Sequence, residues 1–342
     1  MQNKKPGLFI ILFLFLMIIP YADPLDLNWE KPKTISVENN EILKTDLSII
    51  SDKEKLAVIW IQGKIGDSSI FLYLNDSKRS FTIQLTSGHE DRDPRLFKFK
   101  EKYYIIFSRK IIEKKDGKPS YVTPSILMLM ESEDLKLWSE PRIIRINKKD
   151  VDNIEPFACA NDNKIKIFWL TGNQSFKLLS SETENLDDFS KPLHVWEKEG
   201  LIHYPFIIKT GNGKFLLLFQ FNHSIYFSLS DELETWQDPL YLMKHSSREY
   251  RPASIILPDN RILLFYNSSA YIWYTENLKP DNYDDWFKPV QLNIKEENEV
   301  FTDYMIQEIH PVLTLYNNKI FLAWASKRNG IWKIYLTEGK YN

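Results

Sequence analysis

Six polar residues recur along the chain at intervals of 47 to 62 residues, each at the same place in a repeated phrase. They are Asp46, Asp93, Glu155, Tyr204, Arg251 and His310. Each stands directly before a proline, except that the first stands before Leu47. Three carboxylates brought together could supply a general acid and a base or nucleophile for glycoside cleavage. Crowded like charges raise one carboxyl pKa, which is the condition that a general acid needs.

The repeated phrase has the pattern of a β-hairpin. After the proline come three or four strand residues, a short polar turn, a Lys or Arg and a strongly apolar run, as in YPFIIKTGNGKFLLLFQF from Tyr204. The basic residue lies eight or nine positions after the proline position in all six copies. We expect the first strand to begin at the proline, where that residue is tolerated. The second strand is expected to be buried on both faces, with Trp60, Trp169 and Trp324 in the core.

A third strand follows each hairpin, for instance at residues 224–230 and 331–337, and a second phrase then introduces a fourth strand. This phrase, Trp or Phe followed three positions later by Pro, occurs as LWSEP, DFSKP, TWQDP and DWFKP. The last repeat lacks it, but NWEKP stands near the N-terminus at residues 28–32. The pattern predicts an all-β, six-bladed β-propeller with four-stranded blades. A strand from Trp29 to about Val37 is expected to complete the last blade and close the ring, which removes an open sheet edge.

In a propeller the first strands of the blades line a central channel. The six recurring residues, here called the ring residues, should therefore meet at one opening of that channel. The candidate catalytic residues are Asp46, Asp93 and Glu155. The candidate substrate-binding residues are Arg92, Arg95, His203, Tyr204, Tyr250, Arg251, Glu308 and His310, with Arg248 nearby. Two long connections, 109–123 and 293–309, are expected on the same face, where such loops often carry function.

The N-terminus has the features of a secretory signal peptide. A start containing Lys4 and Lys5 precedes the apolar run Leu8–Ile19, and Ala22 follows it. Twelve helical residues reach about 18 Å, too short for a bilayer core of about 30 Å. We therefore predict a signal peptide at 1–22 and a single propeller domain at 23–342. The mature chain should be secreted, periplasmic or in the cell envelope, with no membrane span.

Composition narrows the classes of partner. The net charge is −2, with 44 basic and 46 acidic residues, which argues against a nucleic-acid binder. The single cysteine, Cys159, excludes an internal disulfide and is expected to be a small buried hydrophobe. No cofactor is expected, although the acidic and His ring residues could hold a Ca²⁺ ion, which prefers hard oxygen ligands. We expect a monomer that binds a carbohydrate.

One short motif resembles the Asp-box of sialidase-type propellers, which lies at the turn between third and fourth strands. SEDLKLW at 132–138 fits its shorter form, with Leu135 in the usual Gly position, and SDELETW at 230–236 is a looser copy. The motif is structural and lies on the face opposite the usual pocket. The resemblance implies three arginines that clamp a substrate carboxylate, and Arg251 with Arg92 or Arg95 could belong to them. It also implies a Tyr/Glu nucleophile pair, for which Tyr304 and Glu308 are candidates.

The same wording also resembles the five-bladed arabinanase and fructosidase glycosidases. Those enzymes take their working carboxylates from the first three blades in the order Asp, Asp, Glu, and RDP at 92–94 resembles a fructosidase phrase. By this likeness Asp46 would be base or nucleophile, Asp93 a stabiliser and Glu155 the acid. The favoured function is a glycan-processing glycoside hydrolase acting at the central channel. The alternative is a non-catalytic glycan- or protein-binding propeller of the cell envelope.

Overall fold

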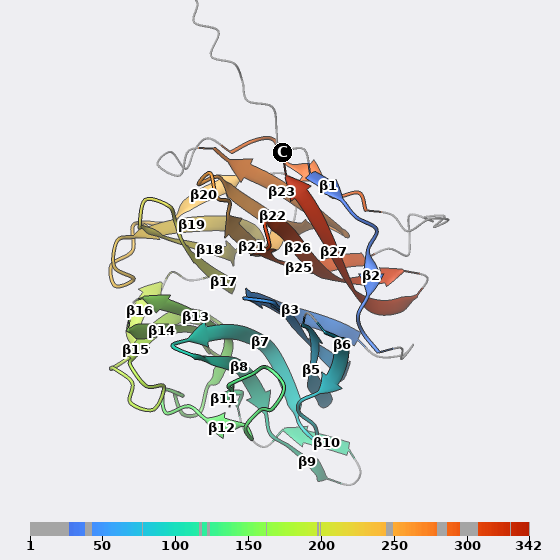
Figure 1. Ribbon diagram of the computed structural model, residues 1–342. Helices are drawn as coiled ribbons and strands as arrows, with labels where there is room; N and C mark the ends of the chain where they lie inside the picture. Colours follow the sequence, from blue (N-terminus) through green and yellow to red (C-terminus); the bar gives the residue numbers. More distant parts are fainter. Residues whose placement is uncertain are drawn as a thin grey trace, which may run out of the picture.

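Every element of regular secondary structure in the described part of the chain is a β-strand, which confirms the all-β class (Figure 1). The computed structural model describes residues 27–37, 43–76, 78–115, 118–121, 124–161, 163–196, 198, 200–243, 249–278, 286–294, 307–328 and 330–341. Within these ranges no helix is long and apolar enough to cross a membrane. The predicted leader, Arg248 and Tyr304 lie outside the described residues.

The strands fall into successive antiparallel groups, most of them four-stranded. The first strands are β3 (Leu43–Asp52), β7 (Glu90–Phe99), β13 (Asp152–Asn161), β17 (Ile202–Lys209), β21 (Glu249–Ile256) and β25 (Gln307–Tyr316). The second are β4 (Lys55–Lys64), β8 (Lys102–Lys110), β14 (Lys164–Gly172), β18 (Phe215–Phe221), β22 (Ile262–Ser268) and β26 (Lys319–Arg328). The third are β5 (Asp67–Asn75), β11 (Ile126–Ser132), β15 (Phe176–Thr183), β19 (Ser224–Ser230), β23 (Tyr271–Asn277) and β27 (Ile331–Tyr341). The short outer strands are β6 (Ser80–Gln84), β12 (Arg142–Ile143), β16 (Leu193–Trp196), β20 (Leu240–Met243) and β24 (Val290–Gln291).

The first strands of the groups lie around the middle of the molecule (Figure 1). They contact one another in chain order, and β25 also contacts β3. Large apolar clusters fill the space between consecutive groups, including the space between the β25–β27 group and the β3–β6 group. The first two groups are joined into one sheet by a single parallel pair, Ser68 with Glu90. The core therefore consists of sheet faces packed side by side around a common centre.

The six predicted hairpins are confirmed, but their first strands do not begin at the proline. Each first strand starts three or four residues earlier and runs through the proline position. At that point a β-bulge places two residues, the ring residue and its successor, opposite one residue of the second strand. The lack of a proline N–H is tolerated because the ladder is already interrupted at a bulge.

All six ring residues adopt a left-handed backbone, with φ between +49° and +59°. Residues other than glycine reach this region at a cost of roughly 1–2 kcal/mol each. Such strain is concentrated at functional sites. Six polar side chains in this conformation therefore indicate that their direction, toward the centre of the molecule, matters more than local backbone preference.

A large aromatic residue stands opposite each bulge. The six are Trp60, Phe107, Trp169, Phe219, Tyr266 and Trp324, and each is fully buried. The prediction that the three tryptophans belong to the core is confirmed. Each of these aromatic side chains packs between two neighbouring sheets. It therefore holds in place the second strand against which the bulge forms.

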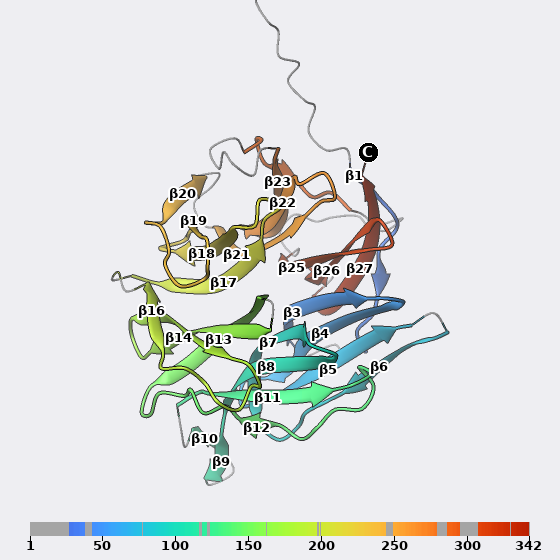
Figure 2. The same cartoon turned by 60° about the vertical axis from the view of Figure 1, so that its left-hand side comes forward.

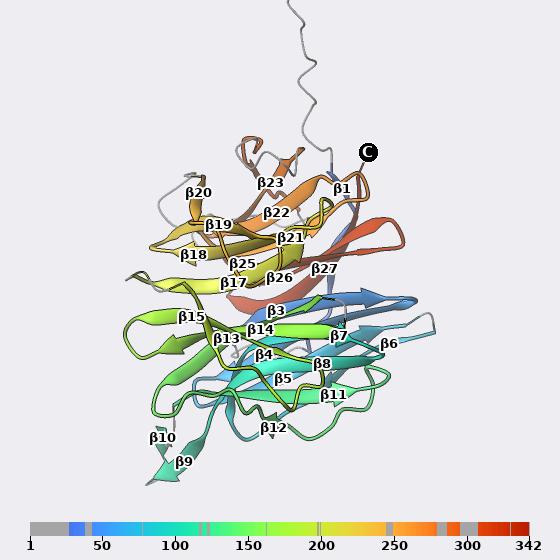
Figure 3. The same cartoon turned by 90° about the vertical axis from the view of Figure 1, so that its left-hand side faces the viewer.

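Two short N-terminal strands pair with the last long strand of the chain. β1 (Leu27–Trp29) pairs with Gly339–Tyr341, and β2 (Lys33–Thr34) pairs with Tyr335 and Leu336. Figures 2 and 3 show β1 beside β27 from two sides. β27 extends beyond the predicted end at residue 337, because its last residues supply the partners of β1.

The long connection after β8 contains a separate hairpin, β9 (Ile112–Lys115) and β10 (Lys118–Tyr121), which projects from the body of the molecule (Figure 2). It leaves β8 at Lys110, which pairs with Glu90 near the start of β7. The hairpin therefore leaves from the end of its sheet that carries Asp93, as expected. Most of the other long connection, 295–306, lies outside the described residues.

Candidate functional site

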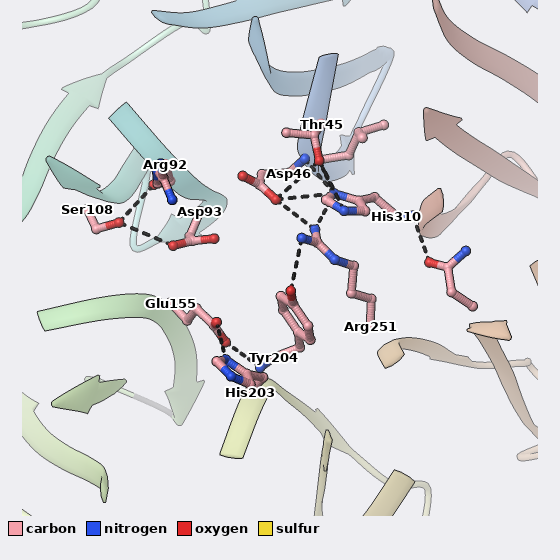
Figure 4. A network of polar contacts seen from close by, with 12 residues as sticks. Thr45, Asp46, Arg92, Asp93, Ser108, Glu155, His203, Tyr204, Arg251 and His310 are labelled. Carbon is pink, nitrogen blue, oxygen red and sulfur yellow. Dashed lines mark hydrogen bonds and ion pairs between the residues drawn. The ribbon is translucent and has the colours of Figure 1, made fainter. Parts of the chain in front are cut away.

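The ring residues gather at a cavity of about 150 Å³ in the middle of the molecule. Five of them line it: Asp46, Asp93, Tyr204, Arg251 and His310. Glu155 is joined to this set because one of its carboxylate oxygens accepts the backbone N–H of Tyr204. Figure 4 shows the six side chains converging from separate strands. The structure therefore brings together residues that lie up to 264 positions apart in the sequence.

Asp46, Arg251 and His310 form one network (Figure 4). Arg251 Nη1 donates to Asp46 Oδ1 at 2.6 Å and also to His310 Nδ1. The backbone N–H of Asp46 donates to the same His310 nitrogen at 2.6 Å. Arg251 lies over the ring of Tyr204, 4.2 Å from its centroid, and donates to its hydroxyl at 3.1 Å. Arg251 is thus held in place by contacts from three different sheets.

The protonation states of this network follow from its geometry. Burial would raise the pKa of Asp46, but the charge of Arg251, which donates to its Oδ1, opposes burial most strongly, and that pKa lies well below its ordinary value. Burial and the neighbouring Arg251 lower the pKa of His310 to about 3. His310 is therefore neutral at pH 7, and its Nδ1 accepts the backbone N–H of Asp46 instead of forming an ion pair with that carboxylate. Burial raises the pKa of Tyr204 to about 12, which leaves its hydroxyl protonated.

Glu155 belongs to a second network with His203 and Tyr204. Its Oε1 lies 2.8 Å from His203 Nδ1, and its Oε2 accepts the Tyr204 N–H. Burial alone would lower the pKa of His203, but the hydrogen bond and the charge of Glu155 outweigh it and raise that pKa. The Glu155 side chain is almost fully buried. Its direction is therefore fixed by two donors from the neighbouring sheet.

Asp93 is the ring carboxyl group whose pKa is raised. Burial raises its pKa first, and repulsion from Asp46 and Glu155 raises it further, to about 7. The charges of Arg251 and Arg95 oppose this shift only in part. Ser108 Oγ donates to Asp93 Oδ2 at 3.2 Å. A carboxyl group with a pKa near 7 can give or take a proton at physiological pH.

The flanking candidates occupy different positions. Arg95 lines the central cavity, donates from Nη1 to the Leu47 carbonyl at 3.0 Å, and has a buried Nε without a hydrogen-bond partner. Arg92 is half exposed, pairs with Glu90 and does not line the cavity. Tyr250 and His203 line a neighbouring cavity. Glu308 lines neither cavity.

Sequence reasoning missed three polar residues on second strands: Ser108, Gln220 and Asn267. Asn267 is fully buried, donates to the Glu308 carbonyl at 2.6 Å and accepts the His310 N–H at 2.8 Å. It therefore positions the strand that carries His310. Each of the three directly follows the aromatic residue opposite a bulge. A polar residue at that place in an apolar run was the available signal.

The Asp-box-like turn after β11 is built as a structural motif. Asp134 Oδ1 accepts the N–H groups of Lys136 and Leu137 at 2.8 and 3.0 Å, and Leu135 has a φ of +67° in the Gly position. Ser132, where the turn begins, pairs with Tyr103 at the start of β8. The turn therefore lies at the opposite end of this sheet from Asp93.

Among the described residues, no group of three or more His, Cys, Asp or Glu side chains is arranged to hold a metal ion. The Ca²⁺ ion considered above stays an untested prediction. Cys159 is buried, and burial raises its thiol pKa to about 12, as expected for an unreactive core residue.

Comparison of the whole fold finds solved structures with a similar architecture. The sialidase of Trypanosoma rangeli, in complex with the inhibitor DANA, aligns with a TM-score of 0.63 at 8% identity over 86% of this chain and 54% of the sialidase. The chain has a sialidase-like propeller fold. A thermostable family-43 glycoside hydrolase aligns with a TM-score of 0.51 at 15% identity over 75% of this chain and 93% of that enzyme. This confirms the resemblance predicted from the sequence.

The chain spans about half the length of the trypanosomal sialidase that it matches. No protein-family model matches the chain, and no curated protein matches its sequence. At these identities the likeness shows a shared fold, so activity has to be argued from the site itself.

We expect His310 and Asp93 to make opposite contributions to the pH dependence of stability between about pH 4.5 and 6. His310 has a pKa of about 3 when folded and near 6.5 when unfolded, so its contribution falls as pH falls. Asp93 has a pKa of about 7 when folded and near 3.9 when unfolded, so its contribution rises as pH falls. Each slope is about 1.4 kcal/mol per pH unit, and in the wild-type chain the two cancel.

Urea unfolding of His310→Gln, Asp93→Asn and the wild type over this pH range gives each contribution as the difference in slope between variant and wild type. The His310→Gln variant should become more stable toward low pH, and the Asp93→Asn variant should become less stable. Slopes of the same sign in both variants would contradict these protonation states.

Proposed function

We propose that the protein is a glycoside hydrolase whose active site is the ring of polar residues at the central cavity. The observation that carries this proposal is Asp93, whose carboxyl pKa is raised to about 7 by burial and by Asp46 and Glu155 beside it. A general acid for a glycosidic oxygen needs a carboxyl group that holds its proton near neutral pH. The fold shared with a sialidase and a family-43 glycoside hydrolase supports the same reaction class.

The environments of the three carboxylates favour an assignment of roles different from the one that the five-bladed glycosidases imply. Asp93 is the general acid that protonates the leaving oxygen. Glu155 is the second carboxylate, which attacks the sugar or activates water, and His203 and the Tyr204 N–H fix its direction. Asp46 is bound to Arg251 and His310 and so holds the guanidinium in place. The unpartnered Arg95 Nε is a donor for substrate oxygens.

We also propose that the strand groups are six blades of a closed propeller, with β1 and β2 completing the blade of β25–β27. Pairing of both strands with β27, and contact of β25 with β3, support this arrangement. A closed ring would keep the six bulges at fixed distances from one another. The leader at residues 1–22 supports export of the mature chain to the envelope or beyond.

Turnover by the chain from residue 23 on fluorogenic α-sialosides, arabinosides, fructosides and common hexosides tests the proposal. We expect one class of sugar to respond, and we expect Glu155→Gln to lower its turnover by at least about 10²-fold. Glu131→Gln is the matched control, because Glu131 pairs with Lys102 at the end of its sheet away from Asp93. It should retain full turnover.

A folded protein that turns over none of these glycosides would overturn the proposal. In that case the ring would be a binding platform for glycans or proteins, the alternative that the sequence left open. Binding to a glycan array would then be the next measurement.

A further inference from the structure

A second cavity, of about 350 Å³, opens beside the ring between the β17–β20 and β21–β24 sheets. It shares Tyr204, Arg251 and His310 with the central cavity, so these three side chains border both cavities. Its volume lies within the roughly 300–1,000 Å³ that is usual for ligand pockets. A ligand that occupied the ring could therefore extend into it.

The Gln220 side-chain oxygen is an unpaired polar atom beside this cavity. The Gln220 side chain is only 4% exposed, lines the cavity, and pairs in register with His203 on β17. Its Oε1 has no hydrogen-bond partner among the described residues. Buried polar groups are almost always hydrogen-bonded, because an unpaired one loses its water without compensation. A ligand hydroxyl that donates to this oxygen would supply the missing bond.

The remaining lining indicates which chemistry fits. Its described residues include no carboxylate, and its arginine, Arg251, is already paired with Asp46. A cationic or anionic ligand would therefore find no free opposite charge from an Asp, Glu, Lys or Arg side chain. Leu201 and Tyr250 offer apolar surface, while Gln220 offers an unpaired amide oxygen. Apolar faces beside amides suit an uncharged sugar ring, which has C–H faces and hydroxyl edges.

We propose that this cavity is a subsite for a second, neutral sugar unit of the same glycan, with Gln220 as its polar anchor. The inference deepens the proposed glycoside hydrolase activity and rests on it. The ring would hold the sugar at the scissile bond, and the Gln220 cavity would hold its neighbour. The natural substrate is then an oligosaccharide rather than a single sugar on a small leaving group.

Gln220→Met tests the subsite, because Met keeps the length of the side chain and removes its amide. For the sugar that responds, we compare kcat/KM on the oligosaccharide with kcat/KM on the fluorogenic monoglycoside. Gln220→Met should lower the ratio of these two values about three- to tenfold. The exposed Gln291→Met on β24 is the matched control and should leave the ratio unchanged. The melting temperature of Gln220→Met should be equal to or above that of the wild type, because an unpaired buried amide oxygen is removed.

A binding measurement separates failure of the subsite from failure of the proposed function. Saturation-transfer NMR with sialyllactose, arabinotriose, kestose and lactose reports contact with the second sugar without any need for turnover. A second-sugar signal that Gln220→Met loses supports the subsite, even if no substrate is cleaved and the hydrolase proposal falls. The same signal in both chains, an unchanged kcat/KM ratio, or no binding of any probe would overturn it.

Discussion

Asp93→Asn should lower turnover of a natural, poorly activated glycoside by about 10²–10⁴-fold, the contribution of a positioned general acid. Asn has the same shape and can still accept the Ser108 hydroxyl, but it cannot release a proton to the leaving oxygen. In the wild-type chain, kcat/KM should fall above about pH 7, as Asp93 loses the proton that its neighbours had kept on it. Steady-state kinetics of both chains over pH measures the two effects.

Substrates with different leaving groups distinguish a general acid from a carboxylate with any other role. A dinitrophenyl glycoside needs no protonation to leave, so Asp93→Asn should lose far less activity on it than on an alkyl glycoside. Glu155→Gln should lose activity on both substrates alike. Asp52→Asn, at the far end of β3 beside Lys98, is the matched control and should keep wild-type turnover. An equal loss on both substrates in Asp93→Asn would show that Asp93 is not the acid.

The features of the fold that depend only on residues close together in the chain could be predicted from the sequence. A turn followed by a Lys or Arg and an apolar run specifies a hairpin locally, so all six hairpins lie where the phrases predicted them. The strand at Trp29 could be placed because its phrase was missing from the last repeat.

The bulges could not be predicted, because a residue before proline ordinarily adopts an extended backbone. Their left-handed conformation arises from pairing with the second strand, where an aromatic side chain occupies the place opposite. The aromatic residue itself recurs 13 or 14 positions after the proline position in all six copies, for instance Trp169 after Pro156 and Phe219 after Pro205. That spacing was a usable signal for the core, though not for the bulge.

The sequence was enough to predict which residues gather at the site, but not the protonation states of their side chains. The recurring phrase placed Asp46, Asp93 and Glu155 in one ring, and the cavity and its hydrogen bonds bring them together. The opposite pKa shifts of Asp46 and Asp93 depend on which side chain pairs with which across sheets. Arg251 takes Asp46 and leaves Asp93 to the repulsion of two carboxylates. Residue type alone could not indicate that burial and two neighbouring carboxylates act on the pKa of Asp93 in particular.

Removal of residues 24–38 should destabilise the whole domain by about 4 kcal/mol or more, a large share of the roughly 5–15 kcal/mol that stabilises a typical domain. Leu27 and Ile35 are buried in two different inter-sheet clusters, and Trp29 packs on Phe265 with ring centroids 6.1 Å apart. Their loss would also leave β27 as an unpaired edge. Thermal unfolding should show a fall in melting temperature of at least about 8 °C.

Point variants on β1 show whether the stability that this strand contributes comes from its buried side chains. Trp29→Ala should cost about 3 kcal/mol, because Trp29 fills the space beside Gly339, where even a Cβ atom would lie 2.7 Å from its ring. Asn28→Ala, on the exposed face of the same strand, should change stability by less than about 0.5 kcal/mol. An unaltered melting curve after removal of residues 24–38 would show that the sheets hold together without this strand. If instead the melting temperature falls and turnover falls with it, the strand that stabilises β27 also holds the six bulges at the distances that catalysis requires.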